Sequence, residues 1–512
     1  MKKDSLILMV ALLFASFSQA QSIGETLQYS QQEILGTARY RALSGAFGAL
    51  GGDLTALSEN PAGSAVFNNS FGSVTLSSKA RTNDVSYFGN TLSNKENNLN
   101  FNQLGAVFVF SNGNSGPSLN KVTLGLTYNQ TADFRDEFVA QGLGTTSIAS
   151  YFIEDAAEFA PDQLEILAGE SFRDAYINIG DELRFSAQQA FLGLEANIIT
   201  PDPDNSTPER NAYQTTLDTN GPFDQEYTYI STGFNGKFTA NLGLQVAKDY
   251  YFGLNLNSHS ATSTKTTIFS ELDNDPDSEI DEVVFRNTLT SISSGFSLNL
   301  GAIAKISDQF RAGLSYESPT WYTIAEEFSQ RLINIQDTGI DFIANPNTIT
   351  ILPDYQLRTP GKLTASAALI FGKQGLISID YSYKDYSNTK FSDEFGEDFN
   401  RQNTAIKERF QATSTYRIGG EYRYENWSYR AGFRYEESPY KENLNNQAYV
   451  GDTQGFSIGA GYNFGKIKLD LAYDRIQQDR SQALYPTSEG FTNTTQVNNT
   501  TNSITATLGL NF

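Results

Sequence analysis

The sequence predicts an all-β transmembrane protein, a fourteen-stranded antiparallel outer-membrane β-barrel with an N-terminal plug and a partly helical long extracellular loop. Three observations lead to this fold. The last ten residues, 503–512, alternate strictly between apolar and polar side chains and end on Phe512. Because side chains of a strand point alternately to its two faces, this segment has one apolar and one polar face. The chain also opens with an export signal, and its alternating segments are joined by short and long connections in turn.

Residues 1–20 have the pattern of a signal peptide. A basic start at Lys2 and Lys3 is followed by an apolar stretch over 6–17 and by small residues before Gln21. No later stretch approaches the roughly 18 consecutive apolar residues that a membrane-spanning helix requires. We therefore expect export across the inner membrane and insertion into the outer membrane by strands alone.

Fourteen alternating segments follow the N-terminal region, and we expect them to form a barrel domain over 64–512. They lie at 71–90, 104–110, 122–128, 238–246, 252–256, 296–304, 310–316, 363–371, 377–383, 416–424, 427–435, 456–464, 467–473 and 504–512. Short turns are expected at 248–249, 307–308, 372–375, 425–426 and 465, and long loops at 131–235, 262–288, 319–360, 385–410, 437–452 and 476–501. This asymmetry is typical of outer-membrane barrels, whose short turns are periplasmic, and an even strand number places both barrel ends there.

Composition narrows the possible functions. The 58 acidic residues outnumber the 36 basic ones, which argues against a nucleic-acid partner. Absence of cysteine removes thiol catalysis and thiolate metal sites. We expect no cofactor, no metal site and no enzymatic activity. The aromatic content of 13% suits the interfacial girdles of a barrel.

Charged side chains occupy the polar, lumen-facing positions of the later strands. They are Asp380, Lys384, Arg417, Glu421, Arg423, Arg430, Arg434, Lys468, Asp470 and Asp474. The uncharged Ser428 lies at a position of the same kind. One interpretation is a ladder of ion pairs that stiffens the wall. The other is that some of the arginines guide an anionic head group through the pore.

The segment 21–63 shows no strand alternation and is rich in glycine, alanine and serine. It is too short to form a domain of its own. A fourteen-stranded barrel has a lumen wide enough to need filling. We therefore expect this segment to fold back as a plug inside the barrel, its small residues permitting close backbone packing.

The stretch 41–53, followed by Thr55-Ala56-Leu57 and Asn60-Pro61-Ala62-Gly63, resembles the hatch of FadL-type outer-membrane transporters. The resemblance is architectural over the whole chain and sharp only over 38–63 and the terminal strand. It implies uptake of hydrophobic molecules, such as long-chain fatty acids, through a plugged barrel with lateral release into the membrane. Lateral release suits an apolar cargo because entering water would cost it more than entering lipid.

The same resemblance implies site residues. Asn60, Pro61 and Ala62, with Gly45 and Gly48, would be hatch or gating positions, although Pro61 could also simply fix the bend into the first strand. The candidate ligand contacts are Arg39 and Arg41, for a carboxylate head group, together with Phe47 and Leu50. The implied partners are a hydrophobic small-molecule ligand, outer-membrane lipid and the barrel assembly machinery.

Two other functions remain open from the sequence. Some FadL-like barrels serve as surface components of protein secretion or assembly systems, and their outer loops bind protein. A gated diffusion porin would instead show steady ion conductance.

Within the loop 131–235, the stretches 155–170 and 188–199 are predicted to form amphipathic helices that either cap the loop or collect ligand.

Two other motifs are expected to carry no chemistry. His259 faces the lumen by alternation, the wrong side for a hydrolase triad on the lipid face. The acidic run from Glu271 to Asp281 departs from a calcium loop at Ser278 and Val284. We expect a solvated loop there, with weak divalent bridging as the alternative.

Overall fold

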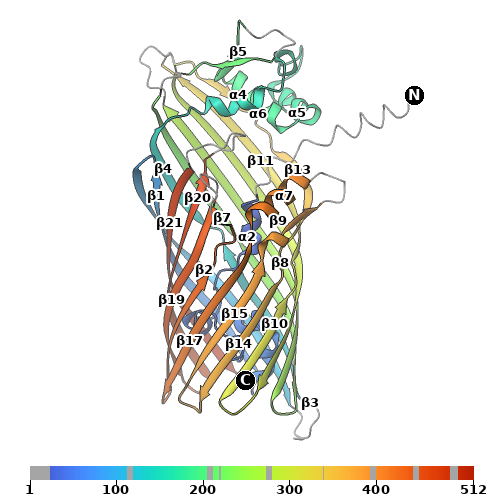
Figure 1. Ribbon diagram of the computed structural model, residues 1–512, viewed down its shortest axis with the longest axis vertical. Helices are drawn as coiled ribbons and strands as arrows, with labels where there is room; N and C mark the ends of the chain where they lie inside the picture. The colour runs from blue at the N-terminus through green and yellow to red at the C-terminus, as the bar shows by residue number, and fades with distance from the viewer. Residues whose placement is uncertain are drawn as a thin grey trace, which may run out of the picture.

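The computed structural model describes residues 23–512, apart from 112–118, 205–210, 218–220, 273–279, 338, 393–398, 442–448 and 485–493. Within this part of the chain, a closed antiparallel barrel of fourteen strands forms the wall (Figure 1), which confirms the predicted fold class. Its strands are β1 (Phe71–Tyr87), β2 (Asn90–Ser111), β3 (Leu119–Asp133), β7 (Phe223–Val246), β8 (Tyr250–Leu272), β9 (Ile280–Lys305), β10 (Phe310–Glu317) continued by β11 (Trp321–Gln336), β13 (Thr350–Arg358) continued by β14 (Lys362–Phe371), β15 (Gly375–Asp385), β17 (Ala412–Tyr424), β18 (Trp427–Glu436), β19 (Tyr449–Asn463), β20 (Ile467–Ala483) and β21 (Thr494–Asn511).

The barrel closes between its first and last strands. β1 pairs with β21 from Phe71–Asn511 to Ser86–Gln496. Short strands β4 (Asp136–Gly144), β12 (Phe342–Ala344) and β16 (Lys390–Ser392) prolong the wall at its upper end, and β5 (Ile199–Pro201) pairs with β6 (Tyr213–Thr215) outside it. Closure leaves the wall without the open edge that a membrane would not tolerate.

Two neighbouring wall strands are interrupted at the same level by prolines. Pro319 separates β10 from β11, and Pro360 separates β13 from β14. Proline lacks an N–H and cannot donate to a ladder. The two breaks are joined by hydrogen bonds from Thr359 N to Thr320 O at 3.0 Å and from Thr320 N to Thr359 Oγ1 at 3.1 Å.

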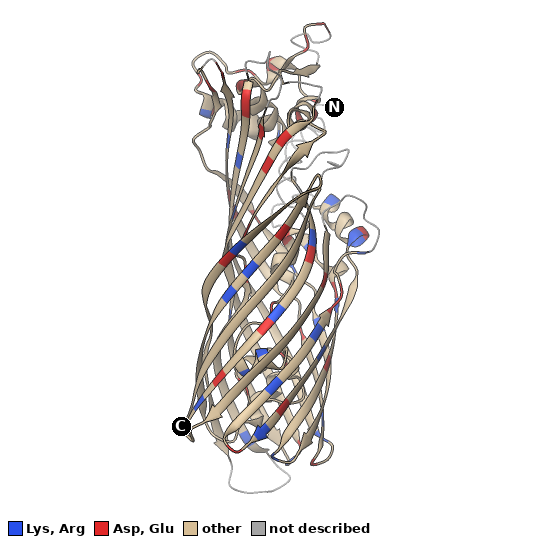
Figure 2. Ribbon diagram, turned by 90° about the vertical axis from the view of Figure 1, so that its left-hand side faces the viewer, with Lys and Arg blue, Asp and Glu red and all other residues tan. Residues whose placement is uncertain are grey.

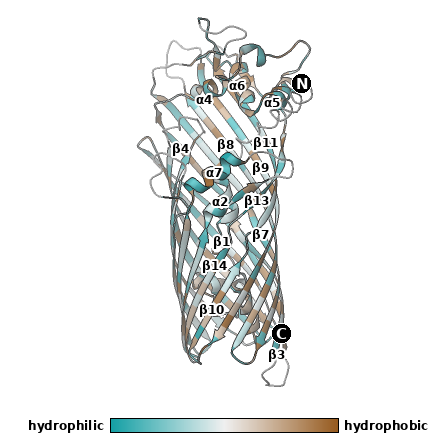
Figure 3. Ribbon diagram, turned by 45° about the vertical axis from the view of Figure 1, so that its right-hand side comes forward, coloured by the Kyte–Doolittle hydropathy of each residue, from teal (hydrophilic) through white to brown (hydrophobic). Residues whose placement is uncertain are grey.

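Apolar and polar residues alternate along the strands of the wall (Figure 3), and successive side chains of a strand point to opposite faces. On β21, Leu508 and Leu510 are exposed to the outside while Thr505 and Thr507 are buried inside. The predicted short turns lie between β7 and β8, β9 and β10, β14 and β15, β17 and β18, and β19 and β20. Among the described residues, no helix is long and apolar enough to span a membrane.

Several predicted loops are largely strand. The ranges 262–288 and 476–501 contain the upper parts of β8, β9, β20 and β21, and 131–235 contains β4 and the start of β7. The prediction followed apolar alternation, which ends where the outward positions become polar, as at Thr262, Thr264 and Thr266. Threonine is β-branched and favours a strand, so the wall continues beyond the apolar belt.

The remaining part of the long loop forms a cap over the upper end of the barrel (Figure 1). It contains α4 (Ala149–Ala156), η3 (Pro161–Gln163), α5 (Phe172–Glu182) and α6 (Phe185–Glu195). The predicted helix over 155–170 is wrong because Pro161 and Gly169 interrupt that stretch, and the one over 188–199 overlaps α6. The cap has its own buried core, which includes Phe152, Phe191 and Leu192.

Residues 23–66, here called the plug, lie inside the barrel and appear blue in Figure 1. They form α2 (Glu25–Ser30), α3 (Ala38–Ala42), η1 (Thr55–Ser58) and η2 (Pro61–Val66). From Ile34 onward almost every plug residue is buried against the inner wall. η4 (Tyr386–Asn388) and α7 (Asn400–Arg409) lie beside α2 in the upper part of the barrel, where Tyr386 and Ile406 share a buried cluster with Leu27.

Candidate functional site: the plug and its contacts with the wall

Glycines on the inner wall let the plug backbone approach closely. Gly243, Gly253 and Gly301 are direct partners across β7, β8 and β9. A Cβ at Gly253 would lie 2.2 Å from the carbonyl carbon of Pro61, and one at Gly301 would lie 2.0 Å from Asn60 Oδ1. The sequence analysis missed this feature, although glycines at lumen-facing strand positions signal it.

Asn60 connects the plug to this stretch of wall. Its Nδ2 donates to Gly48 O at 2.7 Å within the plug and to Ala302 O at 3.1 Å on β9. Its Oδ1 accepts from Ala62 N at 3.1 Å and so caps η2, in which Pro61 is the first residue. Proline suits that position because its missing N–H would have no helical partner. The gating role of these three residues stays a prediction.

A wall carboxylate holds the small-residue run of the plug. Asp380 Oδ2 on β15 accepts hydrogen bonds from Phe47 N and Gly48 N, both at 2.9 Å. A Cβ at Gly48 would lie 2.0 Å from Ser366 Oγ. Gly45 has φ +77°, a conformation that side-chain-bearing residues rarely adopt. Glycine is therefore required at both positions for different reasons, close approach at Gly48 and backbone geometry at Gly45.

The two plug arginines form ion pairs with the wall. Arg41, almost fully buried, donates to Asp474 through Nε at 2.8 Å and Nη2 at 2.9 Å. Arg39 Nε donates to Glu421 at 2.9 Å, and its guanidinium lies over the ring of Phe47 at 5.2 Å. A paired arginine fork is a rigid, charge-assisted contact.

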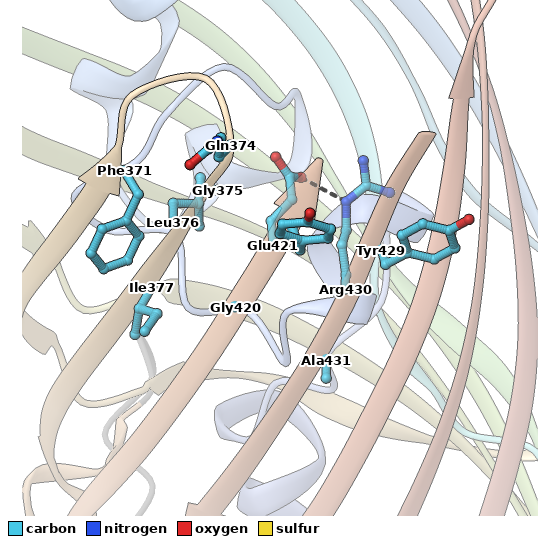
Figure 4. A pocket seen from close by; sticks show the side chains of 11 residues that line it. Phe371, Gln374, Gly375, Leu376, Ile377, Gly420, Glu421, Tyr429, Arg430 and Ala431 are labelled. Carbon is cyan, nitrogen blue, oxygen red and sulfur yellow. Dashed lines mark hydrogen bonds and ion pairs between the residues drawn. The ribbon is translucent and has the colours of Figure 1, made fainter. Parts of the chain in front are cut away.

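Glu421 on β17 is shared by three arginines. Besides Arg39, it accepts from Arg430 Nε at 2.7 Å and Arg423 Nε at 2.8 Å, and Arg430 continues to Asp470. Glu421 and Arg430 are among the residues that line a pocket of about 540 Å³ at the periplasmic end of the wall (Figure 4). The β15–β17 ladder is continuous there from Gly375 to Asp385, so this pocket is a dent in the wall.

Glu59 is the plug's own carboxylate toward the wall. Arg417 Nη1 lies 2.9 Å and Lys362 Nζ 3.4 Å from Glu59 Oε2, and Tyr40 Oη donates to Oε1 at 2.8 Å. Burial alone would raise the pKa of Glu59, but the charges of Arg417 and Lys362 outweigh it and hold that pKa well below its usual range. Glu59 is therefore ionised throughout the physiological range.

Charged residues recur along the strands of the wall (Figure 2), and the contacts described above show what those at lumen-facing positions bind. Arg417, Glu421, Asp380 and Asp474 all contact the plug, whereas the Glu421–Arg430–Asp470 series follows the wall. Half of the ten charged residues, Lys384 included, therefore fasten the plug to the barrel. The sequence analysis did not predict that use.

The predicted ligand contacts lie inside the plug interface. Arg39 and Arg41 are occupied by wall carboxylates, and Phe47 and Leu50 belong to a buried cluster with Tyr40. The structure brings these residues together but does not place them at an open cavity. Their role in ligand binding stays a prediction.

The seam of the barrel also contacts the plug. Ala38 N donates to Thr507 Oγ1 on β21 at 2.7 Å, and that hydroxyl lies 2.8 Å from Thr75 Oγ1 on β1. The N-terminal end of α3 is thus held where the first and last strands meet.

At the upper end of the plug, α2 lies in an aromatic cluster of the upper lumen. Leu27 and Tyr29 of α2 are buried there, and the Tyr29 and Tyr322 rings are 5.2 Å apart. The cluster is completed by Ala132, Phe134, Ala261, Ile324, Tyr355, Leu357, Tyr386, Phe391, Phe399, Ile406, Phe410 and Tyr440. Sequence reasoning missed it because its members come from helices, strands and loops that lie far apart in the sequence.

The ladder between β2 and β3 ends partway up the wall. It runs from Ser111–Lys121 to Gln103–Asn129, and above it β4 pairs with β7. Side chains bridge the break instead, with Asn100 Nδ2 donating to Asp133 Oδ2 at 3.0 Å. On the outside, Leu99 and Phe101 are exposed beside it.

The remaining two motifs make structural contacts where the structure describes them. His259 Nε2 lies 2.9 Å from Ser297 Oγ and its Nδ1 3.3 Å from Tyr322 Oη, on the lumen side. Most of the acidic run, residues 273–279, lies outside the described residues. Glu271 accepts from Ile148 N at 2.9 Å and supports the cap. No group of three or more histidines or carboxylates placed to hold a metal occurs in the described part of the chain.

A closed barrel filled by a plug that its own wall holds defines a plugged outer-membrane channel. The profile of the family described as "Outer membrane protein transport protein (OMPP1/FadL/TodX)" matches residues 231–512, and the chain belongs to this family. It is an outer-membrane protein of a Gram-negative bacterium.

Solved structures share the fold. A FadL homologue of Pseudomonas aeruginosa has 11% identity and a TM-score of 0.55, with 94% of this chain and 100% of that chain covered. The toluene transporter TodX of P. putida has 13% identity and a TM-score of 0.52, with 94% and 99% covered. A search of curated proteins found no match.

Proposed function

We infer that this transporter takes up long-chain fatty acids or similar hydrophobic molecules, binding them in the aromatic cluster around α2 at the upper end of the plug. The observation that carries this proposal is the cluster itself, in which Leu27 and Tyr29 of α2 pack among aromatic side chains inside the barrel. An apolar cargo would replace these two side chains at little cost, because it buries a similar apolar surface.

The cargo would then leave through the break between β2 and β4. The wall there is joined by asparagine side chains rather than by a ladder, and Leu99 and Phe101 form an apolar rim outside it. Opening this break would require the loss of a few side-chain hydrogen bonds, each with a net contribution of about 1 kcal/mol. Opening an intact strand pair would break many more.

Binding can be tested with labelled oleate on purified protein. We expect Phe410→Ala, in the cluster, to weaken oleate binding about tenfold, because one buried aromatic side chain contributes about 1.5–3 kcal/mol. Phe433→Ala, on the lipid face, is the matched control. Labelled toluene in the same assay decides between a long-chain and a monoaromatic cargo. Equal oleate binding by both variants would refute the assignment to this cluster.

The exit can be tested separately because the chain has no cysteine of its own. A disulfide between Asn100→Cys and Asp133→Cys would lock the break. We expect the oxidised protein to bind oleate normally but to lose uptake in cells, and reduction to restore uptake. Full uptake by the oxidised protein would rule out this exit.

A further inference from the structure

A basic pocket of about 700 Å³ lies at the extracellular end of the barrel, apart from the plug and the lumen. Three arginines from three elements line it, Arg173 of α5, Arg286 of β9 and Arg331 of β11. The other lining residues are Thr288, Ser329, Gln330, Asn345, Asn347, Thr348 and Ile349. By alternation with the buried Phe285 and Leu332, Arg286 and Arg331 point away from the lumen.

The arrangement of these charges is unfavourable without an anion. Arg286 and Arg331 are direct cross-strand partners, and like charges in that position repel. In the described part of the chain, none of the three arginines forms an ion pair. The chain carries 58 acidic and 36 basic residues. A cluster of three unpaired guanidinium groups is therefore unexpected from its overall acidic composition.

The pocket stands just above the apolar belt, on the lipid-facing side of the wall. Ile292 is the last strongly exposed large apolar side chain of β9, and the next outward residue, Thr290, pairs with Glu327 on β11. Arg286 lies four residues beyond Thr290, or about 10 Å along the membrane normal at ~3.3 Å per residue and a tilt of ~40°. This is the level of lipid head groups.

Apolar side chains flank the arginines on the same surface. Ile343, Ile349 and Ile351 are 52%, 61% and 76% exposed. Exposed isoleucines beside unpaired arginines match a ligand that has both anionic groups and acyl chains.

We propose that this pocket binds phosphate groups of lipopolysaccharide, the glycolipid of the outer leaflet. Each guanidinium fork can donate two parallel hydrogen bonds to a phosphate, and the threonine, serine and asparagine side chains supply further polar contacts. The bound glycolipid neutralises the Arg286–Arg331 repulsion and fixes α5 of the cap against the wall.

The test compares lipopolysaccharide binding by purified full-length protein and two double variants. Arg286→Gln with Arg331→Gln removes the pocket charges. Arg401→Gln with Lys407→Gln removes two exposed charges from α7 and is the matched control. The probes are deep-rough lipopolysaccharide, the same molecule after dephosphorylation, inorganic phosphate and labelled oleate. Heat-dependent electrophoretic mobility confirms that each barrel is folded.

We expect the pocket variant to bind lipopolysaccharide at least tenfold more weakly, with the control variant unchanged. Dephosphorylation should weaken binding to the native protein by a similar factor, and inorganic phosphate at millimolar concentration should not compete. Equal binding by both variants would overturn the proposal. So would efficient competition by inorganic phosphate, which would indicate a site for a free anion, or a loss confined to oleate, which would indicate a cargo-collecting role.

Discussion

Replacing Gly253 by alanine should loosen the plug without touching any charged group. The new Cβ would lie 2.2 Å from the Pro61 carbonyl carbon and 2.3 Å from Ala62 N, both backbone atoms that no rotamer change can move. Restoring an ordinary contact of about 3.4 Å requires the plug to retreat by about 1.2 Å. The hydrogen bond from Asn60 Nδ2 to Ala302 O, now 3.1 Å, would not survive that movement.

The expected cost is the sum of overpacking and a lost hydrogen bond. Each contributes about 1–3 kcal/mol, so plug docking should weaken by at least about 2 kcal/mol, which corresponds to about a 30-fold larger undocked fraction. A single cysteine at Leu57, fully buried in the plug, reports on undocking through its rate of thiol labelling. The labelling rate should rise about 30-fold in Gly253→Ala.

The matched control is Gly420→Ala on the lipid face of β17. A Cβ at Gly420 would meet only Leu376 O, at 3.7 Å. We expect this variant to label at the native rate and to keep native conductance in planar bilayers, whereas Gly253→Ala should conduct more. Identical labelling of the two alanine variants would show that the close approach of plug and wall does not hold the plug.

Three further changes test the charged contacts. Asp474→Asn leaves the Arg41 charge buried without its carboxylate, so we expect plug docking to lose about 3–5 kcal/mol, seen as faster hydrogen exchange over 38–50. Because the pKa of Glu59 is lowered in the folded protein, its contribution to the stability of plug docking should stay constant from pH 8 to 5. That contribution should decline only as pH falls below the usual glutamate range. Glu59→Gln should remove it at pH 7. Burial, aided by the charge of Glu154, raises the pKa of Asp155 to about 7, so α4 should be most protected from exchange at low pH and lose protection as pH rises through 7. Asp155→Asn should flatten that profile, and an unchanged profile would contradict the assignment.

Alternation predicted the wall correctly wherever lipid demands it. A strand that contacts lipid must have an apolar residue at every second position. Strands such as β21 and β19 can therefore be recognised from their own sequence alone. Above the lipid, outward positions such as Thr262 and Thr264 are free to be polar, and the same strand loses its signal. The loop bounds failed for this reason.

The plug was predicted from its small residues, but its partners were not. Arg41 and Asp474 are 433 positions apart, and their contact depends on barrel tilt and register, which local patterns do not encode. The lumen-facing glycines are different. Gly243, Gly253 and Gly301 occupy lumen-facing positions, where alternation predicts a polar side chain. A glycine at such a position indicates that another part of the chain packs closely against the wall.

The contact of α3 with the seam has a consequence for how the protein is made. Thr507 belongs to the last strand synthesised, and it touches both Thr75 of the first strand and the backbone of the plug. Zipping of the final strand and seating of the N-terminal segment therefore share one hydrogen-bonded junction. If the N-terminal segment lay outside the barrel during insertion, the barrel would close without these hydrogen bonds. Complete barrel closure therefore depends on whether the interior is filled.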